Sequence, residues 1–113
     1  MNEKDISFII PVFNRPNEIK ELLESFVKLF SEKDFEIVII EDGSTNDCQE
    51  VINNFKNKLN ISYYKKNNTG PGDSRNYGMK LAKGSYFIIL DSDCLLPEDY
   101  MHHCMNNLNH KYV

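Results

Sequence analysis

The sequence has no long apolar segment and no excess of positive charge, and each absence excludes a class of protein. No apolar run approaches the roughly 20 residues that a membrane-spanning helix needs. The polar start, residues 1–5, does not resemble a secretory signal peptide. The net charge is −4, so no basic face is available for nucleic acid. We therefore expect a globular protein that neither spans a membrane nor binds nucleic acid.

Cysteine is also scarce, and its spacing carries no metal-binding pattern. Cys48, Cys94 and Cys104 are odd in number and do not form the spaced pairs of a zinc site. Free thiols in a reducing cytoplasm are the expectation. Linkers, internal repeats and low-complexity tracts are absent as well. A chain of 113 residues is long enough for one domain, spanning 1–113, and too short for two.

Short apolar runs alternate with amphipathic segments along the whole chain. This alternation predicts an α/β fold in which a mostly parallel sheet carries helices on both faces. The unbroken apolar run at 86–90 predicts a strand buried on both faces, whereas the more polar run at 60–66 predicts a strand nearer an edge. The expected strands are residues 6–12, 35–40, 60–66 and 86–90, and the expected helices are residues 16–31, 44–59, 73–83 and 97–109.

Local signals add details to this outline. Pro11 lacks an N–H and indicates that the first strand stops pairing there. Asn14 is a possible cap of the first helix, and Ser44 with Asp47 resembles a capping box for the second. Gly84 suggests a left-handed end of the third helix. The adjacent Lys65 and Lys66 are expected to be solvated surface residues.

Polar residues gather where the expected strands end, at 13–14, 41–44 and 91–93. In a doubly wound sheet these ends lie along one edge, which is where ligands bind. Asp91 and Asp93 directly follow a hydrophobic run, where packing gives no reason for two charges. Carboxylates placed in this way can hold Mg²⁺ together with the phosphates of a substrate. We therefore expect a nucleotide site with a divalent cation at this edge.

Three segments of the chain resemble the nucleotide-binding half of family 2 glycosyltransferases, which have the GT-A fold. They are FIIPVFN at 8–14, EDGSTND at 41–47, and the stretch from Asn68 to Asp93 that ends in LDSD. The segments occur in the family's order and cover essentially the whole chain. The resemblance implies a Rossmann-like donor domain that serves inverting transfer of a sugar from a nucleotide-diphosphate sugar. It also implies an unknown glycan or lipid-linked acceptor, a role in cell-surface polysaccharide biosynthesis, and a cytoplasmic location that includes the periphery of the membrane's cytoplasmic face.

The resemblance assigns metal and base contacts to three carboxylates. Asp91 and Asp93, with Ser92 between them, match the family's DxD motif and would bridge Mn²⁺ or Mg²⁺ to the diphosphate. The alternative is that Asp91 caps a turn and Asp93 is merely exposed. Asp42 matches the acidic residue that contacts the base. A carboxylate only accepts hydrogen bonds, so it suits the N–H edge of uracil and disfavours cytosine, while thymine and guanine stay possible. Stabilising the Asp-Gly turn is the alternative for Asp42.

The same resemblance places further nucleotide contacts in two segments. Phe13 would contact the base, with Pro11 and Asn14 in the same segment, although a Phe after a buried strand is often part of the core. Arg75 matches the family's Ala-Arg-Asn signature and would approach the nucleotide or its phosphates. A solvated Arg75 paired with Asp73 is the alternative.

Two departures from the family pattern qualify the interpretation. Cys94 stands where the family often carries a further Asp. The acceptor site and the general base would lie beyond Val113, so we expect a fragment, inactive alone, whose exposed core surface favours homo-oligomers. A non-catalytic nucleotide-sugar-binding module is the alternative function. A phosphotransfer receiver needs its acidic pair after the first strand, and a dinucleotide oxidoreductase needs glycines where residues 13–16 have none.

Overall fold

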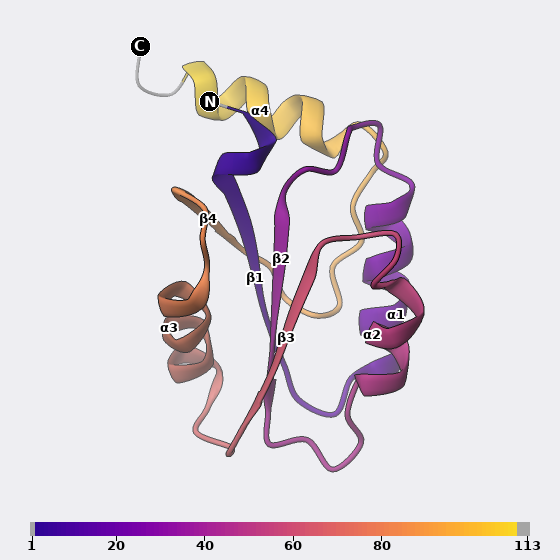
Figure 1. Cartoon of the computed structure of the whole chain (residues 1–113), viewed down its shortest axis with the longest axis vertical. Helices are drawn as coiled ribbons and strands as arrows, with labels where there is room; N and C mark the ends of the chain where they lie inside the picture. The colour runs from indigo at the N-terminus through magenta and orange to yellow at the C-terminus, as the bar shows by residue number, and fades with distance from the viewer. Residues whose placement is uncertain (1, 111–113) are drawn as a thin grey trace.

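The computed structural model describes residues 2–110 as one α/β unit (Figure 1). After a short 3₁₀ turn at Glu3–Asp5, strands and helices alternate along the chain. The strands are β1 (Ile6–Val12), β2 (Glu36–Asp42), β3 (Ile61–Lys66) and β4 (Tyr86–Ile89). The helices are α1 (Pro16–Val27), α2 (Gln49–Phe55), α3 (Pro71–Leu81) and α4 (Tyr100–His110). No helix within residues 2–110 has the length and apolar composition needed to cross a membrane.

The four strands form one sheet in the order β3-β2-β1-β4, and every neighbouring pair is parallel. Helices α1 and α2 cover one face of the sheet and α3 covers the other (Figure 1). Helix α4 crosses the end of the sheet at which β1 begins. The predicted arrangement of a parallel sheet with helices on both faces is confirmed. Because all strands run the same way, their carboxyl ends share one edge of the sheet, away from α4.

The larger part of the core lies between the sheet and helices α1 and α2. Phe8 of β1 contacts Phe26 and Phe35 edge to face, with ring centroids 5.1 and 5.0 Å apart. A smaller apolar cluster lies under α3, around the buried Ile9 and its neighbours on β2. Gly78 lets α3 approach the sheet, since a Cβ there would lie 2.7 Å from Cγ2 of Ile9. Both faces of the two central strands, β1 and β2, are therefore buried.

Strand β4 corrects one prediction, because it is an edge strand and not a strand buried on both faces. Tyr86, Phe87 and Ile89 are 37%, 42% and 39% exposed. An unbroken apolar run indicates only that a strand prefers burial, and it does not say which elements cover it. Helix α3 packs on β1 and β2, so the side chains of β4 on that face stay open to solvent. The more polar β3 lies at the other edge, as predicted.

The course of the chain beyond β4 depends on Pro11. Leu90 still donates its N–H to the carbonyl of Ile9, at 3.0 Å. Two residues further along β1, the same side of the strand carries Pro11, which has no N–H. The ladder between β1 and β4 therefore ends, and the chain is free to turn at Asp91. Toward β2, however, pairing continues through Pro11 to Val12, so the prediction that pairing stops at Pro11 holds on one side only.

Three predicted helix caps are wrong. Helix α2 begins at Gln49 with Cys48 as its N-cap. Asp47 accepts the Gln49 N–H at 3.1 Å, but Ser44 bonds to Glu41 and Asn14, so the predicted Ser44–Asp47 capping box is not formed. Helix α1 has Arg15, not Asn14, as its N-cap. Helix α3 ends at Leu81 with an extended Ala82, and Gly84 is not among the described residues with positive φ. At Gly84 the requirement is space, since a Cβ would lie 2.6 Å from Oγ of Ser7.

Candidate functional site

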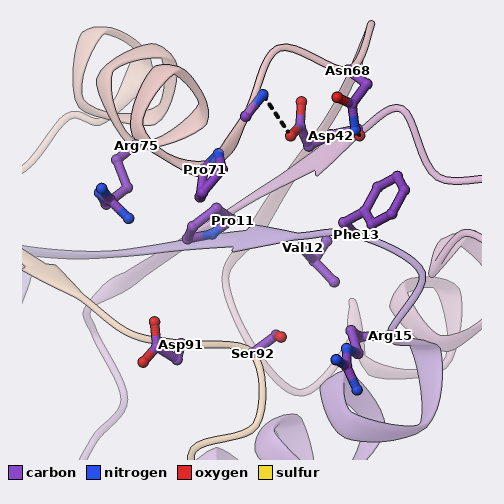
Figure 2. Close-up of a pocket in the computed structure, with 11 residues that line it drawn as sticks. Pro11, Val12, Phe13, Arg15, Asp42, Asn68, Pro71, Arg75, Asp91 and Ser92 are labelled. Atoms are coloured by element: carbon purple, nitrogen blue, oxygen red, sulfur yellow. Dashed lines mark hydrogen bonds between the residues drawn. The ribbon is translucent and has the colours of Figure 1, made fainter.

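A pocket of about 380 Å³ opens at the edge where the strands end (Figure 2). Its walls come from the end of β1, the end of β2, the loop before α3, the first turns of α3 and the turn after β4. Proximity of these segments follows from the parallel sheet, because each segment continues from a strand end or leads into the helix over the sheet. The lining residues are Pro11, Val12, Phe13, Arg15, Asp42, Asn68, Gly70, Pro71, Arg75, Asp91 and Ser92.

The end of β1 supplies an exposed aromatic ring to this pocket. Phe13 is 49% exposed, so it is not the core residue that the alternative interpretation allowed. Pro11 lies between Asp91 on one side and Arg75 on the other (Figure 2). Arg15 also lines the pocket, and its guanidinium is 3.2 Å from Glu18. Sequence reasoning missed Arg15, although its position in the same polar segment was a signal.

The Asp42 carboxylate, at the end of β2, is held by the β3–α3 loop. Its Oδ1 accepts hydrogen bonds from Nζ of Lys66 at 2.7 Å and from the Thr69 N–H at 2.9 Å. Its Oδ2 accepts from the Gly70 N–H at 3.0 Å. Burial by itself would raise the pKa of Asp42, but these hydrogen bonds and the charge of Lys66 outweigh it and lower the pKa. Asp42 is therefore a stable anion on the pocket wall.

Lys66 corrects a second prediction, because it is not a solvated surface residue. Its side chain is 11% exposed and that of its partner Asp42 is 6% exposed. The neighbouring Lys65 fits the prediction better, since it is 49% exposed and pairs with Asp47 at 3.0 Å. Alternation along β3 separates these two lysines, since successive side chains of a strand point to opposite faces. Residue type alone does not distinguish these two lysines.

The DxD segment forms a tight turn directly after β4. The Cys94 N–H donates to the carbonyl of Asp91 at 3.1 Å, which closes the turn. Asp91 and Ser92 line the pocket, whereas Asp93 is exposed and is not among the lining residues. Of the expected pair, therefore, Asp91 lines the pocket in this structure and Asp93 does not.

A divalent cation fits this donor set when a ligand supplies the remaining oxygens. Within residues 2–110, no three His, Cys, Asp or Glu side chains come together in a cluster that could hold a metal ion. The Asp91 and Asp93 carboxylates are hard oxygen ligands at an open surface. Mg²⁺ is commonly held by one or two carboxylates together with phosphates and water, so the residues present suit a metal that arrives with a diphosphate.

Helix α3 contributes a positively charged side chain to the pocket wall. Arg75 is half-buried and lines the pocket one helical turn after Pro71. The alternative ion pair with Asp73 is not formed among the described residues, and Asp73 instead accepts a hydrogen bond from Thr69 at 2.5 Å. The sequence analysis did not predict Asn68 and Gly70 as pocket residues. The only signal in their loop was its turn-forming composition.

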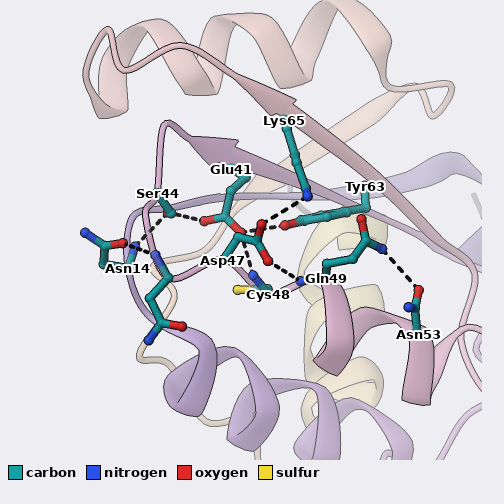
Figure 3. A network of polar contacts seen from close by, with 10 residues as sticks. Asn14, Glu41, Ser44, Asp47, Cys48, Gln49, Asn53, Tyr63 and Lys65 are labelled. Atoms are coloured by element: carbon teal, nitrogen blue, oxygen red, sulfur yellow. Dashed lines mark hydrogen bonds and ion pairs between the residues drawn. The ribbon is translucent and has the colours of Figure 1, made fainter.

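Asn14 is the one predicted nucleotide contact that does not line the pocket. Its φ is +54°, and its Oδ1 accepts a hydrogen bond from the Asn46 N–H at 2.9 Å. Its own N–H donates to Oγ of Ser44 at 2.8 Å. These bonds join the end of β1 to the loop after β2 (Figure 3). In this structure Asn14 therefore holds the Phe13 segment against the loop that follows β2.

The buried Glu41 is the centre of that polar network (Figure 3). Its Oε1 accepts from the Cys48 N–H at 2.8 Å and from the Tyr63 hydroxyl at 2.6 Å, and Ser44 donates to its other oxygen. Burial, followed by the interaction with Glu41, raises the pKa of both the Cys48 thiol and the Tyr63 hydroxyl. The network ties the end of β2 to the loop that follows it and to β3, so Glu41 has a structural role.

Known proteins share this sequence and this fold. The model of glycosyl transferase family 2 matches residues 7–113. An uncharacterised glycosyltransferase of Rickettsia conorii is 46% identical over 99 residues, which are 88% of this chain and 16% of that protein. The poly(ribitol-phosphate) β-N-acetylglucosaminyltransferase TarS of Staphylococcus aureus is 38% identical over 90 residues, 77% of this chain and 16% of TarS.

Solved structures agree with the sequence comparison. The crystal structure of TarS 1–349 in complex with UDP-GlcNAc has a TM-score of 0.85 at 31% identity and covers 92% of this chain and 31% of the TarS chain. A mannosyltransferase from Pyrobaculum calidifontis, solved with GDP-Man and Mn²⁺, shares the fold with a TM-score of 0.74 at 21% identity, covering 82% of this chain and 28% of the other.

The fit to TarS confirms the GT-A fold that the sequence predicted. The chain spans about a sixth of the length of the curated relatives named here. The matched family region nevertheless covers nearly all of the described residues. The chain belongs to glycosyltransferase family 2.

Proposed function

We propose that this chain is the donor-binding part of a glycosyltransferase that uses a nucleotide-diphosphate sugar, with a UDP-sugar as the preferred donor. The complete enzyme would transfer the sugar with inversion to a polysaccharide or lipid-linked glycan. The observation that carries the proposal is the pocket itself. It places an aromatic ring, a buried carboxylate, a guanidinium and the Asp91 carboxylate around one space at the ligand-binding edge of the sheet.

Each side chain of the pocket has a chemical role in this proposal. Phe13 stacks on the base, and the Asp42 carboxylate accepts the N–H of uracil. Arg75 contacts the phosphates near the start of α3, where the helix dipole also favours an anion. Asp91 and Asp93 hold Mn²⁺ or Mg²⁺, which when bound supplies Lewis acidity toward the departing diphosphate. Support for the donor class comes from TarS, which was solved with UDP-GlcNAc.

Calorimetric titration of UDP into the protein tests the proposal. With Mn²⁺ present we expect micromolar binding, and with EDTA we expect that binding to weaken by about tenfold or more, since Asp91 and Asp93 would hold the metal together with the phosphates of the donor. Asp91→Ala and Asp93→Ala should reproduce the EDTA result. Asp99→Ala is the matched control, because Asp99 is exposed at the start of α4, where it pairs with His103.

The outcomes are distinct. Binding that ignores EDTA and both variants would make the DxD turn structural and would contradict the metal assignment. Wild-type protein that binds no UDP at any Mn²⁺ concentration would contradict the donor proposal itself.

A second candidate function is a nucleotide-sugar-binding module without catalysis. The observation in its favour is that both carboxylates lining the pocket, Asp42 and Asp91, have roles on the donor, so neither is free to act as a general base. Incubation with UDP-GlcNAc and glycan acceptors tests this alternative. Turnover would contradict the module, whereas binding without release of UDP agrees both with the module and with a donor-binding part that is inactive alone.

We further propose a cytoplasmic location that includes the periphery of the membrane's cytoplasmic face, and self-association of the chain. The thiols of Cys48, Cys94 and Cys104 are unpaired, which suits a reducing compartment. Exposed apolar side chains along the edge strand β4 support homo-oligomers through this surface.

A further inference from the structure

Lys66 makes three hydrogen bonds, and all of them go to the segments that form one wall of the nucleotide pocket. Its ammonium group donates to the Asp42 carboxylate at 2.7 Å, to the carbonyl of Asn67 at 3.0 Å and to the hydroxyl of Thr69. An ammonium has three donors, so all of them are used. A lysine that is nearly nine-tenths buried is rare unless it is paired. The pairing here fastens the end of β2 to the loop that precedes α3.

This arrangement limits what the Asp42 carboxylate can still do. Two carboxylate oxygens offer about four acceptor positions. Lys66 and the Thr69 N–H occupy Oδ1, and the Gly70 N–H occupies one position on Oδ2. The remaining position on Oδ2 is available to the pocket that Asp42 lines. A ligand would therefore meet a carboxylate whose orientation is already fixed by hydrogen bonds from Lys66, Thr69 and Gly70.

Charges around Asp42 show why Lys66 matters for its ionisation. Burial opposes the anion, and the hydrogen bond from Lys66 is the largest influence that lowers the pKa of Asp42, ahead of the two backbone N–H groups. The other charged groups around the pocket come from different elements, and none has a direct bond to Asp42. They are Arg15 at the start of α1, Arg75 and Asp73 on α3, Asp91 after β4, and Glu41 and Lys65 on the flanking strand ends.

We propose that Lys66 is a positioning residue that determines base specificity: it keeps Asp42 an acceptor-only anion, so that the pocket accepts a base with a ring N–H and rejects cytosine. Uracil presents N3–H to that acceptor, whereas cytosine presents a lone pair at the same position. Two acceptors facing each other leave a buried polar group unpaired, which is costly. Without Lys66, burial favours the neutral acid, which can donate to cytosine. This inference rests on the proposed function, because it concerns the base of the same donor.

The test compares Lys66→Met with the matched control Lys65→Met. Both variants remove one charge from adjacent positions of β3, but the Lys65 ammonium pairs with Asp47 and lies over the Tyr63 ring, not beside Asp42. Binding of UDP and of CDP is measured by calorimetry with Mn²⁺ at about pH 5 and about pH 7.5, on either side of the range in which a buried carboxyl would titrate. Lys66→Arg, which keeps the charge, is the conservative variant.

Expected results separate the four proteins. Wild type and Lys65→Met should prefer UDP over CDP by about tenfold or more at both pH values, since one buried hydrogen bond discriminates by that order. Lys66→Met should lose most of this preference, and more of it at the lower pH, where its Asp42 is protonated. Lys66→Arg should restore the preference. A carbon-13 NMR titration of the Asp42 carboxyl in ligand-free protein should show a higher pKa in Lys66→Met than in wild type.

The failures of the inference and of the proposed function look different. If wild type binds UDP but Lys66→Met keeps its UDP preference and its pH profile, the inference is overturned and the donor site stands. If wild type binds neither nucleotide, the donor proposal fails and base selection fails with it. If Lys66→Met loses its fold by circular dichroism, Lys66→Gln takes its place in the same comparison. An unchanged Asp42 pKa in Lys66→Met, or in Lys66→Gln where it replaces Lys66→Met, overturns the positioning role without any ligand.

Discussion

Removing the hydroxyl of Tyr63 tests the network that holds the carboxyl end of β2. Tyr63 on β3 donates to Oε1 of the buried Glu41 at 2.6 Å, and Tyr63→Phe deletes this bond while it keeps the ring in place. A hydrogen bond to a charged group contributes about 1.5–3 kcal/mol. Glu41 keeps its bonds from Cys48 and Ser44, so we expect a value around the lower end of that range, a loss of about 1–2 kcal/mol in the free energy of unfolding.

The adjacent Tyr64 provides the matched control. Within the described residues the hydroxyl of Tyr64 forms no hydrogen bond, and its ring contacts Tyr77 at a centroid distance of 6.4 Å. Tyr64→Phe should therefore change stability by less than about 0.5 kcal/mol. Urea unfolding followed by circular dichroism measures both variants. For a domain of this size, the Tyr63→Phe loss corresponds to a melting temperature lower by about 4–8 °C.

Alkaline pH gives an independent check of the same bond. Burial and the Glu41 interaction raise the pKa of Tyr63 in the folded protein, whereas a tyrosine in the unfolded chain has a pKa of about 10. Above that pH the unfolded state loses its proton first, so wild-type stability falls as the pH rises toward the folded pKa. Tyr63→Phe lacks this contribution, and the stability difference between the two proteins should shrink. Equal losses for Tyr63→Phe and Tyr64→Phe, or a constant difference above pH 10, would refute the reasoning.

Two further predictions concern a turn and an edge. Gly43 has φ +73°, and a Cβ there would lie 2.6 Å from the Asn68 nitrogen. Gly43→Ala should therefore lower the free energy of unfolding, measured with urea, by about 2–3 kcal/mol. Gly72→Ala inside α3 is the control and should be neutral or stabilising. Unchanged stability in Gly43→Ala would contradict the close packing of these two loops. Ile89→Lys places a charge on the open edge of β4 and should shift sedimentation toward monomer, while Phe30→Lys on another surface should not. A wild-type chain that stays monomeric at high concentration would count against self-association.

Most of the fold and much of the site could be predicted from local sequence. The runs that became β1, β2 and β3 were predicted within one or two residues, because a β-branched or aromatic run between turn signals has few other structures available. The alternation of strands and helices then predicted a parallel sheet, in which the strand ends share one edge. The structure does bring Pro11, Phe13, Asp42 and Asp91 around one pocket at that edge. Their assigned roles stay predictions until binding is measured.

Other features depended on neighbours that lie far away in the chain. Lys65 and Lys66 look alike in the sequence, but only one points at the Asp42 carboxylate, some 24 residues earlier. Asn14 was expected to bind the nucleotide, but it is not among the residues that line the pocket, and its side chain accepts a hydrogen bond from the Asn46 N–H. The choice between a ligand contact and a supporting contact depends on the direction of a side chain in a loop. Local propensity does not define that direction.

The sequence by itself determined the class of fold, the order of its elements and the edge of the sheet where polar residues collect. These features follow from periodicity and from the chirality of parallel strand connections, which act over short stretches of chain. Only the tertiary structure decided that the apolar β4 lies open at an edge and that Lys66 is buried behind the nucleotide pocket. Burial and ion pairing depend on which elements pack together, and that packing is a property of the whole chain.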